Sequence, residues 1–243
     1  MASYEQALAR VPDCAERCLA RGLLLDGRGE PLEPFEKQKS AEGLAVLARD
    51  ERLLVAVGRP APRALERALT ADPTPLEVVT DEDAADAIGA HLRGWSRRAA
   101  TLHVHPDAGL LPAPRHEARA LLPDELARLE LPAELLRELA LAAPRTRIVA
   151  ALDGGEPASF AYAAAESESH WDVSVDTLES HRRRGLATSA FCALAAAMLA
   201  SGKQPVWGAR DDNPASAELA RSLGFHPHRR VVTFRAPLVD AAG

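Results

Sequence analysis

The sequence predicts a mixed α/β protein whose sheet is twisted, largely antiparallel and flanked by helices. Short segments with alternating apolar and polar residues, typical of strands, are interleaved with longer segments that have helical spacing. The clearest strand pair, Arg147–Leu152 and Ala158–Ala164, flanks the glycine-containing turn Asp153–Glu156 and so predicts a β-hairpin. With 243 residues, of which 47% are hydrophobic, the chain can hold one large core or two small ones.

An N-terminal α/β domain is predicted over residues 1–110. Ser3–Leu25 has helical spacing and ends in the turn Asp26–Gly29. The elements expected after it are a hairpin of 45–48 and 53–57, a helix at 63–69, a strand at 76–80, a helix at 81–92 capped by Thr80 or Asp81, and a strand at 99–105. This alternation indicates a mixed α/β unit. Residues 106–114, rich in proline and glycine, are expected to connect it to a second domain at 115–243.

The second domain is predicted to begin with one or two helices between residues 123 and 141. The hairpin then leads into a strand at Trp171–Thr177, which completes a meander of three antiparallel strands. The elements expected after it are a buried helix at 186–199, a strand at 204–210, a helix at 213–224 and a closing strand at 230–235. The last helix has Asn213 as its N-cap, Pro214 at its first position and Gly224 as its C-cap.

The turn between residues 177 and 186 has the composition of an anion site. Its sequence ends in Arg182-Arg183-Arg184-Gly185, directly before the predicted helix. The first backbone N–H groups of a helix have no internal partner, and the helix dipole favours negative charge there. Gly185 has no Cβ, so the main chain can approach a bulky phosphate, and arginine supplies donors suited to phosphate oxygens. We therefore expect this turn to hold a pyrophosphate.

Two motifs resemble those of the GNAT superfamily of acyl-CoA-dependent N-acyltransferases. The family's coenzyme loop, (Q/R)-x-x-G-x-(G/A), is matched by Arg182, Gly185 and Ala187. The family's later segment is N-x-x-S-x-x-L-x-x-x-L-G-F. Its matches here are Asn213, Ser216, Leu219, Leu223, Gly224 and Phe225. The two motifs occur in the family's order and spacing, and the resemblance covers about residues 115–236.

The resemblance implies a GNAT-like fold and an N-acetyltransferase with acetyl-CoA as co-substrate. The pantetheine arm would lie along Val173, Val175 and Thr177. There the strand at 204–210 would separate from the strand at 171–177, because Pro205 and Gly208 weaken continuous pairing. The residues implied near the diphosphate or pantetheine are Arg182, Arg183, Arg184, Gly185, Leu186, Ala187, Thr188, Asn213 and Ser216. A primary amine of a small molecule or peptide would attack the thioester directly, in a ternary complex, with the oxyanion held by a main-chain N–H near 173–175. The helices between 123 and 141 would flank this acceptor.

An amine nucleophile must lose a proton, so a general base is expected at the start of the central strand. The candidates are Glu168, His170 and Asp172, which share one face by the period-two rule. Asp172 is a charged residue within an otherwise apolar strand, and such a residue usually has an ion-pair partner or a functional role. The alternative is that Glu166, Glu168 and His170 merely occupy a hairpin turn.

One position departs from the family, and it leaves two functions open. Ala220 stands where many members carry a tyrosine that protonates the departing thiolate. Because a thiol pKa of about 8.5 makes the thiolate a tolerable leaving group, activity is not excluded. The two functions are the N-acetyltransferase and a catalytically inactive CoA-binding regulatory module. The N-terminal domain is either a degenerate copy of the C-terminal architecture or a lid that supplies the acceptor pocket.

Composition argues against several other classes of protein. A net charge of −6 and a pI near 5.8 speak against a nucleic-acid partner. No apolar run reaches the ~20 residues of a membrane span, so a cytoplasmic protein with no membrane partner is expected. The three cysteines form no disulfide framework. No metal is expected, because His103 and His105 lack a third ligand and are predicted to be structural, and His226 and His228 are expected at the surface. A homodimer is left open.

Overall fold

The computed structural model describes residues 2–32, 43–72 and 74–237, and the chain divides into two compact units. Unit 1 takes its residues from 1–102, 208–217 and 227–243, and unit 2 takes its residues from 103–207 and 218–226. The sequence predicts a single cut near residues 110–115, whereas unit 1 also contains two segments from the C-terminal half. Residues 1, 33–42, 73 and 238–243 of the predicted domains lie outside the described residues.

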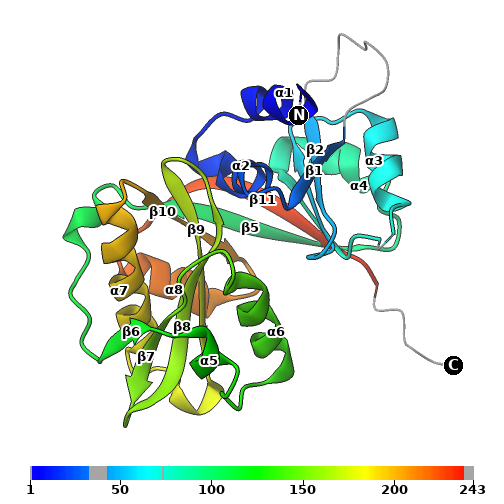
Figure 1. The fold of residues 1–243 in the computed structure, drawn as a ribbon. Coiled ribbons are helices and arrows are strands. Elements are labelled where there is room, and N and C mark those ends of the chain that lie inside the picture. Colours follow the sequence, from blue (N-terminus) through cyan, green and yellow to red (C-terminus); the bar gives the residue numbers. More distant parts are fainter. Residues whose placement is uncertain (1, 33–42, 73, 238–243) are drawn as a thin grey trace, which may run out of the picture. The chain divides into compact units, whose positions relative to one another are not determined.

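Unit 1 is a sheet with helices on both faces (Figure 1). Its elements are α1 (Ala2–Arg10), α2 (Cys18–Leu25), β1 (Gly29–Leu32), β2 (Leu44–Ala48), β3 (Leu53–Val57), α3 (Pro62–Leu69), β4 (Glu77–Asp81), α4 (Ala85–Gly89), β5 (Ser96–Val104) and β11 (His226–Arg235). Residues 103–104 of β5 and residue 226 of β11 belong to unit 2. Its strands lie in the order β1-β2-β3-β4-β11-β5.

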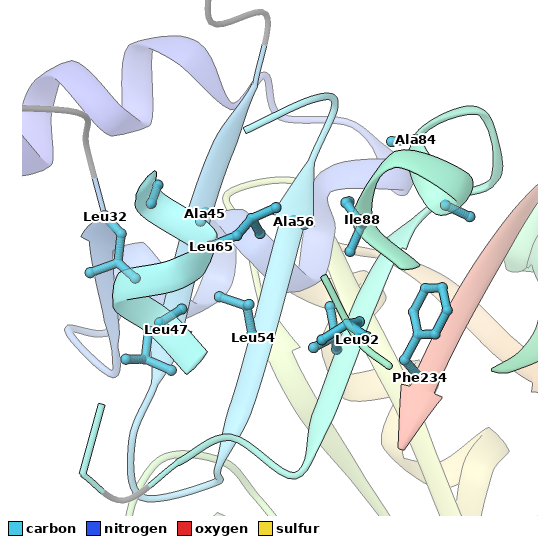
Figure 2. Packing of buried hydrophobic residues seen from close by; sticks show 14 of the residues in the cluster. Leu32, Ala45, Leu47, Leu54, Ala56, Leu65, Ala84, Ile88, Leu92 and Phe234 are labelled. Carbon is cyan, nitrogen blue, oxygen red and sulfur yellow. The ribbon is translucent and has the colours of Figure 1, made fainter. Parts of the chain in front are cut away.

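Two apolar clusters hold the helices of unit 1 to its sheet. Leu65 of α3 and Ile88 of α4 pack with Leu54 and Phe234 on one face, as Figure 2 shows. The helices α1 and α2 pack on the other face, where Leu23 joins the cluster that contains the β2 residues 44, 46 and 48. Alternate residues of β2 therefore point to opposite cores, as a strand buried on both faces requires.

Unit 2 is also a sheet between helices (Figure 1). Its elements are β6 (Ala118–Ala120), α5 (Pro123–Leu126), α6 (Ala133–Ala142), β7 (Val149–Asp153), β8 (Glu156–Glu166), β9 (His170–Thr177), α7 (Leu186–Ala200), β10 (Gln204–Arg210) and α8 (Pro214–Ser222), the last two of which continue into unit 1. The strand order is β10-β9-β8-β7-β6. The helix α7 packs on β7, β8 and β9, and α5 and α6 cover the other face, where Leu126 and Leu139 meet Phe160 and Tyr162.

The two units repeat one order of elements. In each unit, two helices precede three antiparallel strands, β1–β3 or β7–β9. A helix, α3 or α7, then leads to a strand that runs parallel to the third one, so that β4 pairs with β3 and β10 pairs with β9. A second helix, α4 or α8, leads to the last strand of the repeat. The last strand of the chain, β11, pairs antiparallel with β4 and thus lies in unit 1.

The predicted fold class is confirmed, with differences in single elements. The strands β1 and β6 were not predicted, because four and three residues are too few for a clear alternation. The predicted helix at 3–25 is interrupted after residue 10, where Pro12 cannot donate a helical hydrogen bond. The predicted helix at 81–92 is a 3-10 turn (Glu82–Ala84) followed by the short α4. None of the helices in the described ranges is long and apolar enough to cross a membrane.

Candidate functional site

The strand β9 is paired along nearly its whole length with β8 on one side and only briefly with β10 on the other. Seven residue pairs join it to β8, whereas its parallel ladder with β10 covers three, from His170–Gln204 to Asp172–Val206. Beyond Asp172 this edge of β9 has no ladder partner among the described residues. Residues 173–177 are half-buried. A free strand edge of this kind can pair with the backbone-like amides of an extended ligand.

An aromatic cluster holds β9 and β10 against α7. Trp171 stacks on Phe191 with ring centroids 5.9 Å apart, and Phe191 meets the ring of Trp207 at 5.2 Å. Phe225 packs against both Phe191 and Trp207. All four rings are buried, and such pairs each contribute about 0.5–1.5 kcal/mol beyond area burial. This cluster fixes the place where the two strands part.

The loop after β9 has the backbone conformation of an anion-binding turn. Arg183 and Gly185 have positive φ values, 62° and 81°, and Gly185 is the N-cap of α7. Consecutive backbone N–H groups in such a turn form a concave nest for anions. Ser189 N–H donates to the Gly185 carbonyl at 3.1 Å, so the amides of 186–188 precede the first helical bond and have no helical acceptor. A Cβ built on Gly185 would meet only the His116 ring, at 3.6 Å or more. The residues present therefore fit a diphosphate.

The three arginines of this loop differ in their contacts. Arg184 forms a bidentate ion pair with Asp153 of the β7–β8 turn: Nη2 lies 2.8 Å from Oδ1, and Nη1 contacts Oδ2. Arg182 Nε donates to the Thr177 carbonyl at 3.4 Å. Arg183 is exposed, and its side chain has no ion pair or hydrogen bond within the described part of the chain. Arg184 is thus engaged within the protein, and the phosphate contacts expected of all three arginines stay a prediction.

The predicted bases lie at different places along the chain. Glu168 is exposed in the turn between β8 and β9. The alternation of side chains along a strand therefore does not place it on one face with His170 and Asp172. His170 is the first residue of β9, and its Nδ1 lies 2.9 Å from Ser169 Oγ. Asp172 stands at the last pair of the β9–β10 ladder, opposite an irregularity in β8. Burial raises the pKa of Asp172 from 3.8 to about 7, although the side chain keeps some exposed surface. Glu166, included in the turn alternative, pairs with Lys203 at 2.8 Å.

Two carboxylates, Glu138 and Asp176, lie close to Tyr162 on the face of the sheet that α5 and α6 cover. The Tyr162 hydroxyl donates to Glu138 Oε2 at 3.4 Å. Burial raises the pKa of Glu138, and the charges of Asp176 and Glu134 raise it further. Burial also raises the pKa of Asp176, against the opposing charge of Arg182. Carboxylates whose pKa values are raised in this way are stabilised by a cation bound among them.

The second motif forms the predicted helix. Asn213 caps α8, since its Oδ1 accepts from the Ser216 N–H at 3.3 Å, and Gly224 ends the segment with a φ of 90°. Asn213 and Ser216 belong to unit 1 and the loop at 182–188 belongs to unit 2, so their contact with the coenzyme stays a prediction. Ala220, at the position of the family's tyrosine, is fully buried.

The histidines are engaged in structural contacts or lie at the surface. His103 Nδ1 lies 3.3 Å from the Trp207 carbonyl, and His105 Nε2 lies 2.9 Å from the Leu223 carbonyl. Each of these histidines thus has a main-chain carbonyl as partner, and the structural role predicted for them stays a prediction. His226 is exposed, and His228 pairs with Glu16 at 2.7 Å. Among the described residues there is no group of three or more His, Cys, Asp or Glu that could hold a metal ion.

Sequence reasoning missed three residues that support the loop. Asp153 binds Arg184, and His116 Nε2 lies 2.8 Å from the Arg184 carbonyl. Ser189 Oγ accepts the backbone N–H groups of Arg115 and His116, both at 3.1 Å. The acidic residue of the predicted Asp-Gly-Gly turn was a usable signal for Asp153. No sequence pattern pointed to His116 or Ser189, because their contacts join residues far apart in the sequence.

Comparisons with known proteins agree with this architecture. Residues 149–234 match the model of the GNAT acetyltransferase family. A GCN5-related N-acetyltransferase-like protein from Streptococcus suis is similar in structure, with a TM-score of 0.71 and 19% identity over 97% of this chain and 99% of that one. For a GCN5-related N-acetyltransferase from Kribbella flavida the TM-score is 0.63, with 20% identity over 92% and 95% of the two chains.

A third solved structure is a tandem GNAT protein from the clavulanic acid biosynthesis pathway. Its TM-score is 0.53, with 17% identity over 80% of this chain and 78% of that one. The comparison with curated proteins found no match. At these identities the solved structures bear on the fold, and the family model bears on residues 149–234. The resemblance of the C-terminal half to the GNAT superfamily is therefore confirmed, and the chain has the fold of GNAT proteins.

Proposed function

We propose that the protein is an N-acetyltransferase that transfers the acetyl group of acetyl-CoA to a primary amine in a ternary complex. The family match and the fold support acyl transfer. The observation that carries the proposal is the early end of the β9–β10 ladder, followed along the same chain by the loop with positive φ at Gly185. The free edge suits the pantetheine amides, and the unpaired N–H groups suit the diphosphate.

The proposed reaction is a direct attack by the amine nitrogen on the thioester carbonyl carbon. The C–N bond forms, the C–S bond breaks, and the CoA thiolate leaves and takes a proton from solvent, which its pKa of about 8.5 permits. Asp172 is assigned as the general base that accepts the amine proton, because it stands where the strands part. A main-chain N–H at 173–175 on the free edge of β9 is assigned to the oxyanion.

The acceptor is proposed to be a small-molecule or peptide amine that carries positive charge in its resting form. Glu138, Asp176 and Tyr162 lie on the sheet face covered by α5 and α6, the helices that the resemblance places beside the acceptor. Burial raises the pKa of both carboxylates, and the charge of Asp176 raises that of Glu138 further, so an ammonium group bound beside them would stabilise their charged forms. A cationic substrate is therefore favoured over a neutral one.

The test is thiol release from acetyl-CoA with a panel of cationic and neutral primary amines. Release above the hydrolysis background is expected with at least one amine. D172N should lower the rate by about 10²–10⁴-fold, while E168Q and H170Q change it much less. Coenzyme binding without amine-dependent thiol release would favour the alternative, a catalytically inactive CoA-binding regulatory module. That alternative is suggested by the buried Ala220, which stands in place of the family's tyrosine. Absence of coenzyme binding would refute both.

For the N-terminal half, we infer a second copy of the same architecture whose coenzyme opening is closed. Its loop between β3 and α3 is short, residues 58–61. Gly58 N–H donates to Asp81 Oδ2 at 3.0 Å, and Arg17 donates to Asp81 Oδ1 at 2.8 Å. The buried Asp81 thus joins the ends of β3 and β4 where β9 and β10 part in the other unit.

The same loop is also covered by backbone. A Cβ built on Gly43 would clash with the backbone nitrogen of Arg59, so the chain at Gly43 packs directly on this loop. Arg10 Nη2 donates to the Gly43 carbonyl at 2.6 Å and holds that segment in place. These contacts, together with the repeated element order, favour the degenerate copy over a lid that supplies the acceptor pocket.

A further inference from the structure

We infer that Asp153 is a positioning residue for the coenzyme loop, and that Arg184 acts on the loop through Asp153 instead of contacting the diphosphate. This inference rests on the proposed function, because it takes the loop at 182–188 as the coenzyme site. It departs from the family motif, which includes neither residue.

Asp153 lies at a tight turn and uses both carboxylate oxygens. It ends β7 in a tight turn whose Gly154 and Gly155 have φ values of 62° and 93°. Its Oδ1 and Oδ2 accept the fork of Arg184, a geometry stronger and more specific than a single contact. His181 Nε2 lies 3.4 Å from Oδ2. Asp153 therefore contacts the loop at His181 and at Arg184, on both sides of Arg182 and Arg183.

A second set of contacts holds the main chain at the same point. His116 Nε2 lies 2.8 Å from the Arg184 carbonyl, and because a carbonyl only accepts, this nitrogen donates. The segment that carries His116 is tied to the buried Ser189 of α7 by two backbone N–H groups. Residue 184 is thus held by its side chain and by its carbonyl. Arg183, next to it, keeps a positive φ and an exposed side chain.

Two explanations of Asp153 predict opposite signs for its removal. If Asp153 only adds negative charge near a diphosphate, or draws Arg184 away from it, D153N should tighten CoA binding. If Asp153 positions the loop, D153N should weaken binding because the amides at 183–188 lose their fixed arrangement. A misplacement of about 1 Å at a binding group is enough for such a loss.

The experiment is calorimetric titration of CoA into the wild type, D153N, R184Q and the double variant. E156Q is the matched control, since Glu156 is an exposed carboxylate in the same hairpin. D153N and R184Q are each expected to weaken binding about tenfold, with the double variant no weaker than either one. E156Q should change it less than about twofold. The KM for acetyl-CoA should rise while kcat at saturation stays unchanged. Tighter binding by D153N, or multiplicative losses in the double variant, would overturn the inference.

Trypsin supplies a readout that needs no coenzyme, because Arg182 and Arg183 are cleavage sites inside the loop. In the ligand-free protein, D153N should be cut there faster than the wild type, and E156Q should be cut at the wild-type rate. Equal rates in all three proteins refute the positioning role. If the wild type binds no CoA, the proposed function fails, yet these cleavage rates still decide the role of Asp153. Matching thermal midpoints show that the variants remain folded.

Discussion

Asp172 is a residue at which stability and activity are expected to oppose each other. Burial raises its pKa in the folded state to about 7, above the value of about 3.9 expected in the unfolded chain. Between these two pH values the folded state binds more protons than the unfolded state, so stability falls as pH rises. The stabilising, protonated form is complete below about pH 4 and is lost as pH rises through about 7.

D172N should therefore stabilise the protein at pH 8, by about 1–2 kcal/mol, and leave its stability at pH 4 nearly unchanged. Urea unfolding followed by tryptophan fluorescence at both pH values measures the difference. In the wild type, kcat/KM should rise with pH through about 7, because the base must be deprotonated. An equal gain in stability at both pH values would contradict the pKa assignment. E168Q serves as the control, since Glu168 is exposed.

Glu138 and Asp176 are expected to set the preference for a cationic acceptor. E138Q and D176N should each raise the KM for a cationic amine by about 3–10-fold, because each removes a partly desolvated negative charge. Steady-state kinetics with a cationic amine and a neutral amine of similar size measures the effect. The neutral amine and the affinity for CoA should not respond. E130Q, which changes an exposed carboxylate after α5, is the control. An equal rise in KM for E130Q would contradict the role assigned to Glu138 and Asp176.

At the scale of the element, α7 offers a matched pair of glycines at its two ends. Gly185 at the start and Gly202 after the end have φ values of 81° and 79°, and neither has a close neighbour at its Cβ position. G185E and G202E therefore carry similar backbone strain, about 1–2 kcal/mol. They differ in the end of the helix at which they add a negative charge and a side chain.

G185E is expected to abolish CoA binding and G202E to leave it intact, as measured by calorimetry. The glutamate at 185 would occupy the place of the diphosphate, whereas residue 202 lies at the opposite end of the helix. Both variants should show a cooperative thermal transition. Retained affinity in G185E, or a loss in both variants, would count against the loop as the diphosphate site.

At the scale of the whole molecule, the repeated element order raises the question of one coenzyme site or two. The closure inferred for unit 1 from the contacts of Asp81 and Gly43 predicts one CoA per chain. Calorimetry and native mass spectrometry should both give a stoichiometry of one. G185E should leave no residual binding, because the Asp81 contacts occupy the equivalent place in unit 1. A second equivalent, or binding that persists in G185E, would show that unit 1 is open to the coenzyme.

Much of the fold and part of the site could be predicted from the sequence. The hairpin at 153–156, the helix caps at Asn213 and Gly224 and the tight turn at Gly185 were all visible, because each depends on residues close together in the chain. The engagement of Arg184 by Asp153 was not visible, since its two residues are 31 positions apart and neither motif includes the aspartate.

The sequence by itself determined the type of each long element, the glycine turn before α7 and the family resemblance, because backbone preferences and short motifs act over a few residues. Tertiary structure decided which edge of β9 stays unpaired, that β11 completes unit 1 beside β4, and that Asp81 closes the loop after β3. These features depend on which distant segments the folded chain brings together. The pairing of these distant segments is set by packing and strand register across the molecule, so no local sequence pattern predicts it.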